Sequence, residues 1–505
     1  MLPLLPITAE ASNVDDELVV GIQSTKTTAI RPLEPIERDF MSIYDLMYDG
    51  LMYINDDYLP DCALAEDYDV SSSGKTWTFT LRDDLHFSDG NPVTADDVVA
   101  TAKWILARAN SENVADPGYY ANLKYFVKDI KADGPKTVVV TSSRAYMGVL
   151  YAMTFPVLPA WALDSDNPPG TGAYKVSSFA PFDSLTLEPN TEWWQTPPQV
   201  TRITFLMHEN PAEVIESYEY ARVDAIFTRS ISSAQYKNGT SSLALDYRTN
   251  QLECLLMNHG AFPLDSKNVR EALRYLIDVD KIAQQIYNGM VERTDTPFIS
   301  GTWMYNDNLQ NYFRTDPAKA VALLEQDGWT DTNDDDILDK PVDGELVSLS
   351  LDLYVYEEPE DNVRLETANM IKDTLAKYGI EVNVVTKSFS EVADNLKNGA
   401  FELCLASFAM DVCPDAGFML MNSNTGNYGR YRSTAMTDLC TKLRTQMDQS
   451  GYQQTLHQIQ EQFAQDCPFI CFFYRSGVVL TRRMYTVTRD VRELELLRGI
   501  ETFHD

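Results

Sequence analysis

The side chains that could support catalysis are few in this sequence and form no recognised motif. None of the five histidines belongs to a His-Glu-x-x-His zinc motif, and no Gly-x-Ser-x-Gly turn offers a nucleophilic serine. Glycine loops of the phosphate-binding type are also absent from the sequence. Carboxylate pairs are plentiful, but in a chain with 75 acidic residues a glycosidase-like pair is a chance match. The sequence therefore predicts a protein that is not an enzyme and uses no cofactor.

The strongest metal candidate is an acidic turn at residues 331–339. Its Asp and Asn residues stand at alternate positions from Asp331 onward, as the oxygen ligands of a calcium loop do. Asp336, however, occupies the position that such a loop reserves for Gly, and Val342 occupies that of the bidentate Glu. A solvated acidic turn is the preferred interpretation, with calcium binding as the alternative.

The seven cysteines are too few for a disulfide scaffold in a chain of 505 residues, and their odd number leaves at least one unpaired. Most have apolar neighbours, which favours buried thiols. Pairing of Cys467 with Cys471, or of Cys404 with Cys413, stays open at this point. The spacing contains no Cys-x-x-Cys and gives no support to zinc binding.

Alternating and helical patterns of apolar residues predict a mixed α/β protein with several sheets. Thr94 and Asp97 have the spacing of a capping box and mark the start of one helix. The expected strands are residues 18–22, 77–81, 185–188, 203–206, 252–258, 346–356, 380–385, 469–474 and 477–480. The expected helices are residues 94–109, 269–277, 281–287, 317–325, 366–378, 390–398, 436–448 and 453–464.

The overall charge limits the partners of the chain. A formal net charge of -34 repels nucleic acid and anionic membrane surfaces, so neither is expected as a partner. No stretch reaches the roughly 18 apolar residues that would span a bilayer. Residues 1–7 are apolar and are followed by Ala9-Glu10-Ala11, a small-x-small pattern that suits signal peptidase. Residues 1–11 are therefore interpreted as the tail of a secretory signal, or as a structureless start.

Four segments of the chain carry specific motifs. The first and most specific spans residues 64–98 and includes Thr76-Trp77-Thr78-Phe79-Thr80-Leu81-Arg82 and His86-Phe87-Ser88-Asp89-Gly90. The others are Gly170-Thr171-Gly172-Ala173-Tyr174 with Trp193-Trp194, Asn268-Val269-Arg270-Glu271-Ala272-Leu273, and residues 320–329 with the Asp-rich turn and then Lys377-Tyr378-Gly379-Ile380-Glu381-Val382. With these motifs the chain resembles the peptide- and nickel-binding family of ABC-transporter solute receptors, from about residue 17 to about residue 485. In this family the Asp-rich turn has no usual metal role.

The resemblance implies an α/β fold of the periplasmic-binding-protein type, a two-lobed Venus flytrap with an extra inserted subdomain that closes by hinge bending. Lobe I would be discontinuous, and the hinge strands would lie near residues 252–258 and 469–474. The expected ranges are 12–46, 168–252 and 474–505 for lobe I, 47–167 for the inserted subdomain, and 253–473 for lobe II.

The resemblance also implies a ligand anchor. Receptors of this family often pair one Asp of the C-terminal lobe with the α-ammonium of a peptide, and Asp411 takes that position. The alternative is that Asp411 only braces its own loop. Phe408 stands where the family usually has Trp, and Pro414 is displaced by one residue, so the pocket is altered. Trp303 and Tyr428 could stack on a sugar, and Arg430 could meet a ligand carboxylate, unless they serve the core or surface ion pairs.

The expected function is that of an extracytoplasmic, monomeric receptor that captures short peptides and delivers them to an ABC permease in the membrane. One alternative keeps the fold and changes the ligand to an oligosaccharide or another small solute. The second alternative is a ligand sensor that signals through a membrane partner without transport.

Overall fold

The computed structural model describes residues 17–34, 37–111, 118–237, 243–309, 312–358, 362–422, 425–482, 491–497 and 499–500. Its central feature is an eleven-stranded mixed sheet that runs through the whole molecule, in the order β17-β16-β18-β12-β19-β11-β1-β10-β9-β8, with β13 paired to β19. The strands are β1 Glu17–Gln23, β8 Tyr174–Ala180, β9 Ser184–Pro189, β10 Arg202–His208, β11 Ala225–Thr228, β12 Leu243–Met257, β13 Val291–Arg293, β16 Ser350–Tyr356, β17 Glu381–Lys387, β18 Leu403–Ala409 and β19 Phe469–Thr481.

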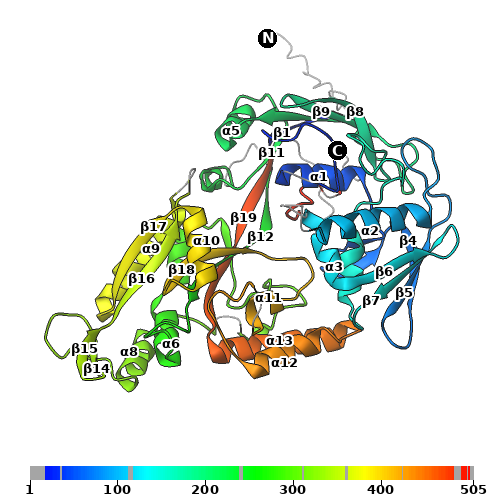
Figure 1. Cartoon of the computed structure of the whole chain (residues 1–505). Coiled ribbons are helices and arrows are strands. Elements are labelled where there is room, and N and C mark those ends of the chain that lie inside the picture. The colour runs from blue at the N-terminus through cyan, green and yellow to red at the C-terminus, as the bar shows by residue number, and fades with distance from the viewer. Residues whose placement is uncertain are drawn as a thin grey trace, which may run out of the picture.

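Strands β12 and β19 connect the two halves of this sheet. They are antiparallel partners over most of their length and cross the molecule together, from the lobe II strands to the lobe I strands (Figure 1). Their pairing shifts register between Arg248 and Leu252, which places an irregularity at the crossing point. The predicted strand at 252–258 was therefore too short at its start. The two predicted strands at 469–474 and 477–480 form one strand, because Arg475 and Ser476 continue the ladder between two apolar runs.

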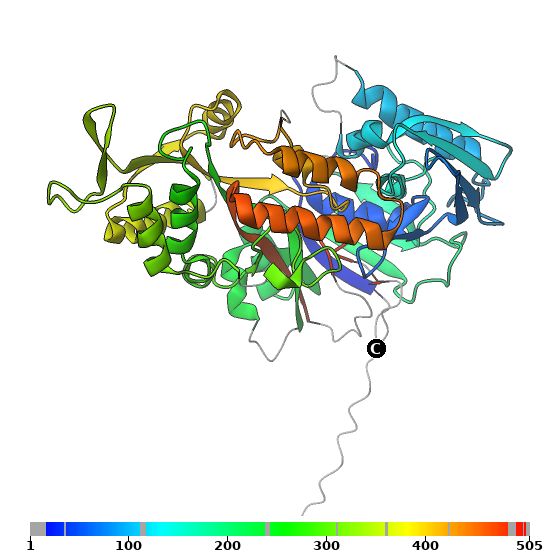
Figure 2. The same cartoon turned by 90° about the horizontal axis from the view of Figure 1, so that it is seen from below.

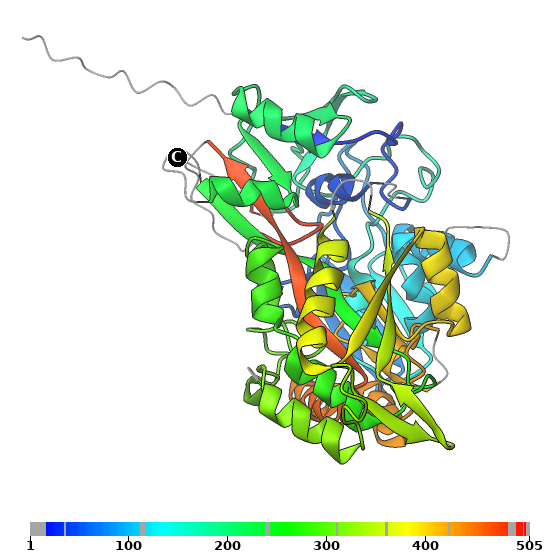
Figure 3. The same cartoon turned by 90° about the vertical axis from the view of Figure 1, so that its left-hand side faces the viewer.

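Alternate residues of the lobe II strands face two different hydrophobic clusters. Leu403 and Leu405 of β18 belong to one cluster, and Cys404 and Ala406 belong to the other. Helices α6 Lys267–Leu276, α7 Val279–Gln285, α8 Pro317–Gln326 and α9 Val363–Leu375 contribute to the first cluster. Helices α10 Phe389–Asn398, α11 Gly417–Leu420, α12 Thr434–Leu443 and α13 Gln449–Asp466 contribute to the second. Helices thus cover both faces of this half of the sheet (Figure 3).

The predicted strand-helix-strand unit of lobe II is confirmed. Strands β16 and β17 are parallel neighbours, and α9 connects them. The predicted boundaries were off by a few residues, because α9 begins at Val363 and a 3₁₀ turn, Ala376–Tyr378, follows it. Helix α13 begins earlier than predicted because the Asp448 side chain accepts a hydrogen bond from the Gly451 backbone amide.

Four strands between residues 65 and 142 form a separate antiparallel sheet, in the order β4-β5-β7-β6. The predicted strand at 77–81 is its second strand, and Trp77, Phe79 and Leu81 are all buried in the core. The predicted capping box opens α2, with both Thr94 and its Asp97 partner in place. The strands are β4 Ala65–Val70, β5 Thr76–Leu81, β6 Val127–Ala132 and β7 Thr137–Ser142, and the helices are α2 Ala95–Ala109, α3 Leu123–Phe126 and α4 Gly148–Tyr151.

The remaining elements flank the sheets. Two short hairpins are formed by β2 Met52–Ile54 with β3 Pro60–Cys62, and by β14 Asp339–Val342 with β15 Glu345–Ser348. Lobe I adds helices α1 Arg38–Met47 and α5 Pro211–Glu219. The 3₁₀ turns are Tyr119–Asn122, Ala152–Thr154, Ile231–Tyr236, Asp307–Leu309 and Ala376–Tyr378.

The Gly170-Thr171-Gly172 motif fits tightly against the end of α1. A side chain on Gly172 would approach the carbonyl oxygen of Leu46 to 2.6 Å, so only glycine allows this contact. Between the two glycines, the Thr171 hydroxyl accepts a hydrogen bond of 2.9 Å from the Asp49 backbone amide. This contact positions α1 and the β2–β3 hairpin, which together form one side of the candidate site.

Candidate ligand-binding cleft

The main candidate site is a cavity of about 370 Å³ next to α1. Its walls come from α1, the β2–β3 hairpin, the 3₁₀ turn Tyr119–Asn122, and Leu494, Glu495 and Gly499, and it reaches the lobe II loop at Val412. The charged side chains in these walls are Asp45, Asp49, Arg82 and Glu495. The aromatic side chains are Tyr44, Tyr48, Tyr53, Tyr119, Tyr120, Trp193 and Trp194.

Asp411 lies beside this cavity because of the way β18 ends. The strand pairs with β12 up to Ala409, and the Met410 amide then donates a hydrogen bond of 2.8 Å to the carbonyl oxygen of Asn250. The chain turns there, at the point where β12 crosses between the two halves of the sheet. Asp411 is the next residue and Val412, in the cavity wall, follows it.

The carboxylate of Asp411 has partners on both sides of the cleft. Oδ1 accepts a hydrogen bond of 3.1 Å from the Cys413 amide in its own loop, and Oδ2 accepts one of 2.5 Å from the Asn122 side chain of the inserted subdomain. The side chain of Asp411 remains exposed. The surrounding protein nevertheless removes part of its hydration and raises its pKa, while these hydrogen bonds oppose the increase. An ionised Asp411 is therefore a poorly hydrated anion, which a cationic group can stabilise.

Two acidic side chains lie near Tyr119. Its side chain is 47% exposed and packs edge-on against Tyr120, with ring centroids 5.0 Å apart. Desolvation is the main cause that raises the pKa of the Tyr119 hydroxyl, the negative charges of Asp411 and Glu495 raise it further, and Arg38 opposes the increase. Asp411 and Glu495 therefore both act on the part of the cleft around Tyr119.

The opposite end of the cavity is held by a stacked pair. The Arg82 guanidinium lies 4.6 Å from the ring centroid of Trp194, and its Nε donates a hydrogen bond of 2.6 Å to the carbonyl oxygen of Ala63. The Trp194 indole N–H donates one of 2.9 Å to the Asp49 carboxylate. These contacts explain why the motif residues Arg82, Trp193 and Trp194 lie together in one wall.

Three of the aromatic and acidic residues named from the sequence lie around the same loop. Phe408 is buried, and its ring stacks on Tyr428 with centroids 6.2 Å apart and an interplanar angle of 20°. It also meets Phe418 edge-on at 5.9 Å. Phe408 and Tyr428 thus pack against each other beneath the Asp411 loop, and they are not among the residues that line the described cavity.

Trp303 and Arg430 occupy other positions. Trp303 is half-buried between Tyr452 of α13 and the β2–β3 hairpin, with its Nε1 3.5 Å from the Tyr58 carbonyl oxygen. Arg430 is exposed, and its Nη2 donates a hydrogen bond of 2.5 Å to the carbonyl oxygen of Asn398 at the end of α10. It lies near Gly260, beyond the far end of β12 from Asn250 and Asp411. The structure therefore does not bring Arg430 and Asp411 together.

The inserted subdomain also contacts lobe II directly. The Tyr146 hydroxyl lies 3.0 Å from the Tyr452 hydroxyl and 3.3 Å from the Asp415 carboxylate, which in turn binds Arg444 at 2.6 Å. The Met147 amide donates a hydrogen bond of 3.0 Å to the carbonyl oxygen of Gln446. Seen from below, α13 runs across the molecule toward this subdomain (Figure 2). The two halves thus meet at the hinge and again here, as expected of a closed cleft.

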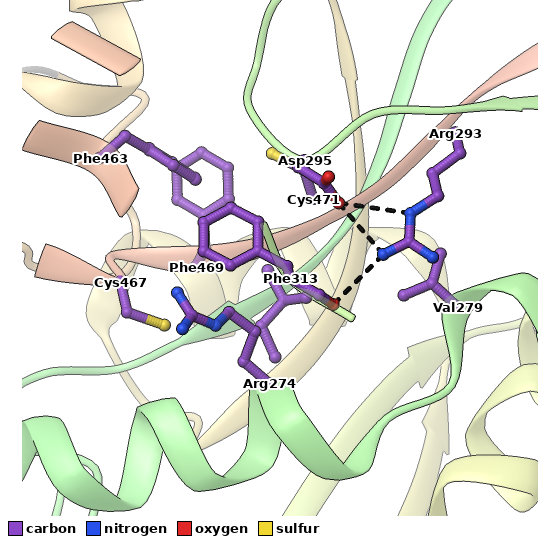
Figure 4. Close-up of a pocket in the computed structure, with 10 residues that line it drawn as sticks. Arg274, Val279, Arg293, Asp295, Phe313, Phe463, Cys467, Phe469 and Cys471 are labelled. Carbon is purple, nitrogen blue, oxygen red and sulfur yellow. Dashed lines mark hydrogen bonds and ion pairs between the residues drawn. The ribbon is translucent and has the colours of Figure 1, made fainter. Parts of the chain in front are cut away.

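A second cavity lies inside lobe II but has room for little more than one water molecule, at about 10 Å³. In Figure 4 the Arg293 guanidinium points toward Asp295, which it binds at 3.1 Å, and toward the Phe313 carbonyl oxygen. The Arg274 guanidinium lies 4.0 Å from the Phe313 ring centroid. These contacts connect the strands and loops of the core, and the space is too small for a peptide or a sugar.

In the acidic turn, backbone amides of the turn itself donate hydrogen bonds to the carboxylate of its first residue. The amides of Asp334, Asp335 and Asp336 all donate hydrogen bonds to the Asp331 side chain. In the part of the chain that the structure describes, no cluster of three or more His, Cys, Asp or Glu side chains is arranged to hold a metal ion. All seven cysteines are free thiols, so neither Cys467 with Cys471 nor Cys404 with Cys413 forms a disulfide here.

Several site residues were not found from the sequence. Tyr119 and Asn122 lie in a stretch with no recognisable sequence pattern, and Glu495 is far from both in the sequence. Their proximity to Asp411 depends on long-range packing, and no local signal in the sequence indicates it. The Gly-Thr-Gly motif and the tandem Trp193-Trp194 were the available signals for the cavity wall, and both had been recognised only as family motifs.

Comparisons with known proteins agree with this architecture. A model of bacterial extracellular solute-binding proteins, family 5 middle, matches residues 60–430. The oligopeptide-binding protein AppA of Bacillus subtilis is 22% identical over 490 residues, covering 91% of this chain and 86% of that protein. The nickel-binding protein NikA of Staphylococcus aureus is 22% identical over 446 residues, covering 85% and 84% of the two chains.

Among solved structures, NikA from Brucella suis in complex with Fe(III)-EDTA superimposes with a TM-score of 0.81 at 19% identity, and covers 97% of this chain and 99% of that one. The two-lobed α/β fold predicted from the sequence is thereby confirmed. The relatives are solute-binding proteins and not enzymes, as predicted. The chain belongs to the family 5 bacterial extracellular solute-binding proteins, which serve ABC importers of peptides or nickel.

Proposed function

We propose that this protein captures short peptides outside the membrane and delivers them to the permease of an ABC importer. The observation that carries the proposal is the position of the Asp411 carboxylate, which lies next to the cavity and is bound across the cleft by Asn122. The α-ammonium of a peptide can replace that neutral amide as the hydrogen-bond donor. The exchange converts a neutral-donor bond into a charge-assisted one, which is shorter and stronger.

The energetic gain from this exchange is substantial. A hydrogen bond that involves a charged group contributes about 1.5–3 kcal/mol, against about 1 kcal/mol for a neutral pair. The carboxylate of Glu495, which like Asp411 acts on Tyr119, is a second acidic group near this end of the cleft. A peptide N-terminus therefore fits this end of the cleft better than a neutral group does.

The cavity walls suit the remainder of a short peptide. Ligand pockets generally enclose about 300–1,000 Å³, and this cavity is at the small end of that range. Its aromatic rings offer flat apolar surfaces for side chains, and ring faces combine with polar edges as in other small-molecule sites. These features favour a ligand of a few residues.

The division into lobes and their hinge motion are part of this proposal. Lobe I would comprise 12–46, 168–252 and 474–505, the inserted subdomain 47–167, and lobe II 253–473. The register shift in β12 next to Leu252, and the continuous crossing strands, support a hinge at that point. Ligand binding would then stabilise the closed arrangement over an open one.

We further propose an extracytoplasmic location and a monomeric state. Residues 1–11, interpreted as the tail of a secretory signal, lie outside the described residues. No helix in the described ranges is long and apolar enough to cross a bilayer. The net charge of -34 supports a protein that stays dissolved and separate from anionic surfaces and nucleic acid.

Other ligands remain as competing outcomes. The relatives include nickel-binding proteins, but no histidine is among the described residues that line the cavity. For an oligosaccharide, Tyr428 is not free to stack because its ring packs on Phe408, so stacking would have to use the aromatic rings of the cavity wall. A sensor would bind the same ligand and lack a permease partner.

Native mass spectrometry of the purified protein, followed by denaturation, tests the proposal. We expect short peptides to be released from the wild type and from an Asp331→Ala control, whose carboxylate serves only the distant acidic turn. The Asp411→Ala variant should lose the bound population. Release of a sugar or a metal complex would overturn the peptide proposal, and unchanged occupancy of Asp411→Ala would overturn the anchor.

A further inference from the structure

The C-terminal segment, residues 491–497 with 499–500, forms one wall of the proposed peptide site. Leu494, Glu495 and Gly499 line the cavity, although the rest of the segment is packed in the core. Leu496 is buried, and its amide lies 3.2 Å from the Ser42 hydroxyl of α1. The segment is therefore a fixed boundary of the cavity on the α1 side.

The segment is attached to the β2–β3 hairpin through Arg492. Its guanidinium donates hydrogen bonds of 2.6 Å and 3.0 Å to the carbonyl oxygens of Ile54 and Asn55 in the β2–β3 hairpin. It also lies 4.9 Å from the ring centroid of Tyr58 and binds Glu495 at 2.9 Å. Arg492 thus fixes the hairpin and the C-terminal segment relative to each other.

Glu493 attaches the same segment to lobe I and the hinge. Its buried carboxylate binds Arg38 at 2.6 Å and Arg229 at 3.3 Å, and accepts a further hydrogen bond from the Asn250 amide. Asn250 is in the part of β12 where the register shifts. The attachments of Arg492 and Glu493 hold the two residues that directly precede Leu494 in one position.

Leu494 adopts a backbone conformation that leucine normally avoids. Its φ angle is +69°, in the left-handed region that favours glycine. Such strain persists where the surrounding contacts impose it, and it concentrates at functional sites. Here the anchored Arg492 and Glu493 precede Leu494 and the buried Leu496 follows it, and together they hold this conformation with Leu494 in the cavity wall.

From this arrangement we infer that the C-terminal segment limits the length of the peptide that the cavity accepts, with Leu494 as the limiting side chain. The inference rests on the proposed peptide function. A ligand anchored at Asp411 would extend past the neighbouring Val412 into the cavity of about 370 Å³, which the segment bounds. A longer peptide would have to displace the C-terminal segment. The contacts of the Arg492 side chain with the β2–β3 hairpin, and those of the Glu493 side chain with lobe I, hold this segment in place.

The test is a Leu494→Gly variant, measured by isothermal titration with dialanine, trialanine and pentaalanine. Glycine adopts the positive φ without strain, so the variant is expected to fold at least as well as the wild type. The matched control is Phe182→Gly, at an exposed turn where φ is +64° and no cavity is present. Melting temperatures of all three proteins verify that they are folded.

We expect pentaalanine to gain about tenfold or more in affinity for Leu494→Gly, with dialanine unchanged within about threefold. Phe182→Gly should keep the wild-type preference. An equal change for all three peptides, or an unchanged length preference in Leu494→Gly, would overturn the inference and leave peptide capture intact. Failure of the wild type to bind any of the three would instead count against the proposed peptide function itself.

Discussion

The side-chain amide of Asn122 donates a hydrogen bond of 2.5 Å to the carboxylate of Asp411, although 289 positions separate the two residues. One residue belongs to the inserted subdomain and the other to lobe II, so this bond closes the cleft from both sides. Together with the Tyr146–Tyr452 contact at 3.0 Å, it favours the closed arrangement even without ligand. The balance between open and closed forms should therefore respond to changes at Asn122.

An Asn122→Asp variant should open the ligand-free protein. It replaces the donor with a second carboxylate, and two like charges at hydrogen-bond distance repel each other. We expect a larger radius of gyration by small-angle X-ray scattering near pH 7, and recovery of the compact form near pH 4. Asn167→Asp, at an exposed position in the inserted subdomain, is the matched control. Equal compactness of both variants at neutral pH would contradict a closing role for Asn122.

Asp411 and Arg430 should differ sharply in their importance for peptide binding. Loss of a charge-assisted hydrogen bond in Asp411→Ala should weaken trialanine binding about 10- to 150-fold. Arg430→Ala should change it less than about threefold, because its guanidinium binds the Asn398 carbonyl beyond the far end of β12. Titration calorimetry on the two variants distinguishes these outcomes. A large loss for Arg430→Ala would show that the ligand extends farther than the described cavity.

Asp39 should make stability depend on pH between about 4 and 6. Desolvation raises its pKa to about 6, despite the nearby Arg229 and Arg38. Because the folded protein then holds a proton that the unfolded chain has released, stability should fall as pH rises through this window, by up to about 3 kcal/mol. Urea unfolding at pH 4, 5, 6 and 7 measures this change in the free energy of unfolding. The Asp39→Asn variant should lose this part of the pH dependence of the free energy of unfolding. An identical pH dependence in the variant would refute the assignment to Asp39.

Glu493 should be critical for stability. Its side chain is only 5% exposed and has Arg38, Arg229 and the Asn250 amide as partners, so Glu493→Ala leaves two partly buried guanidinium groups without their carboxylate. A loss of about 3–5 kcal/mol is expected in urea unfolding. Asp83→Ala removes one partner of the exposed pair with Lys136, and should change stability by less than about 1 kcal/mol. Similar losses in the two variants would argue against a structural role for Glu493.

The sequence was most informative where local rules decide the structure. The Thr94–Asp97 capping box and the alternation of Trp77 with Phe79 depend on neighbours a few residues away, and both were predicted correctly. The fold class came from motifs such as Gly170-Thr171-Gly172, whose close contact with α1 requires glycine. These signals act over short distances, so they can be read from a single chain.

The rest of the structure depends on contacts between distant segments. Strand β19 was divided in two because Arg475 and Ser476 interrupt its apolar pattern, while the strand is maintained by pairing with β12 and β13. Asp411 was predicted as a ligand-binding residue from the family resemblance. No pattern in the sequence indicated that Asn122 would be its hydrogen-bond partner. Arg430 was named because guanidinium groups suit carboxylates, and only the tertiary structure shows that it lies away from the Asp411 loop.

The way β19 completes lobe I has a consequence for the order in which the protein forms. Strand β1 is the first strand of the described structure, but its neighbour β11 has β19 as its other partner, and β19 ends at Thr481. As the polypeptide emerges from the ribosome or from an export channel, about half of the sequence must follow β11 before this partner is available. Strands β12, β16, β17 and β18 lie between β11 and β19 in the sequence and are neighbours in the sheet, so they can pair first. The binding cavity, with Glu495 in its wall, is then among the last parts of the molecule to be built.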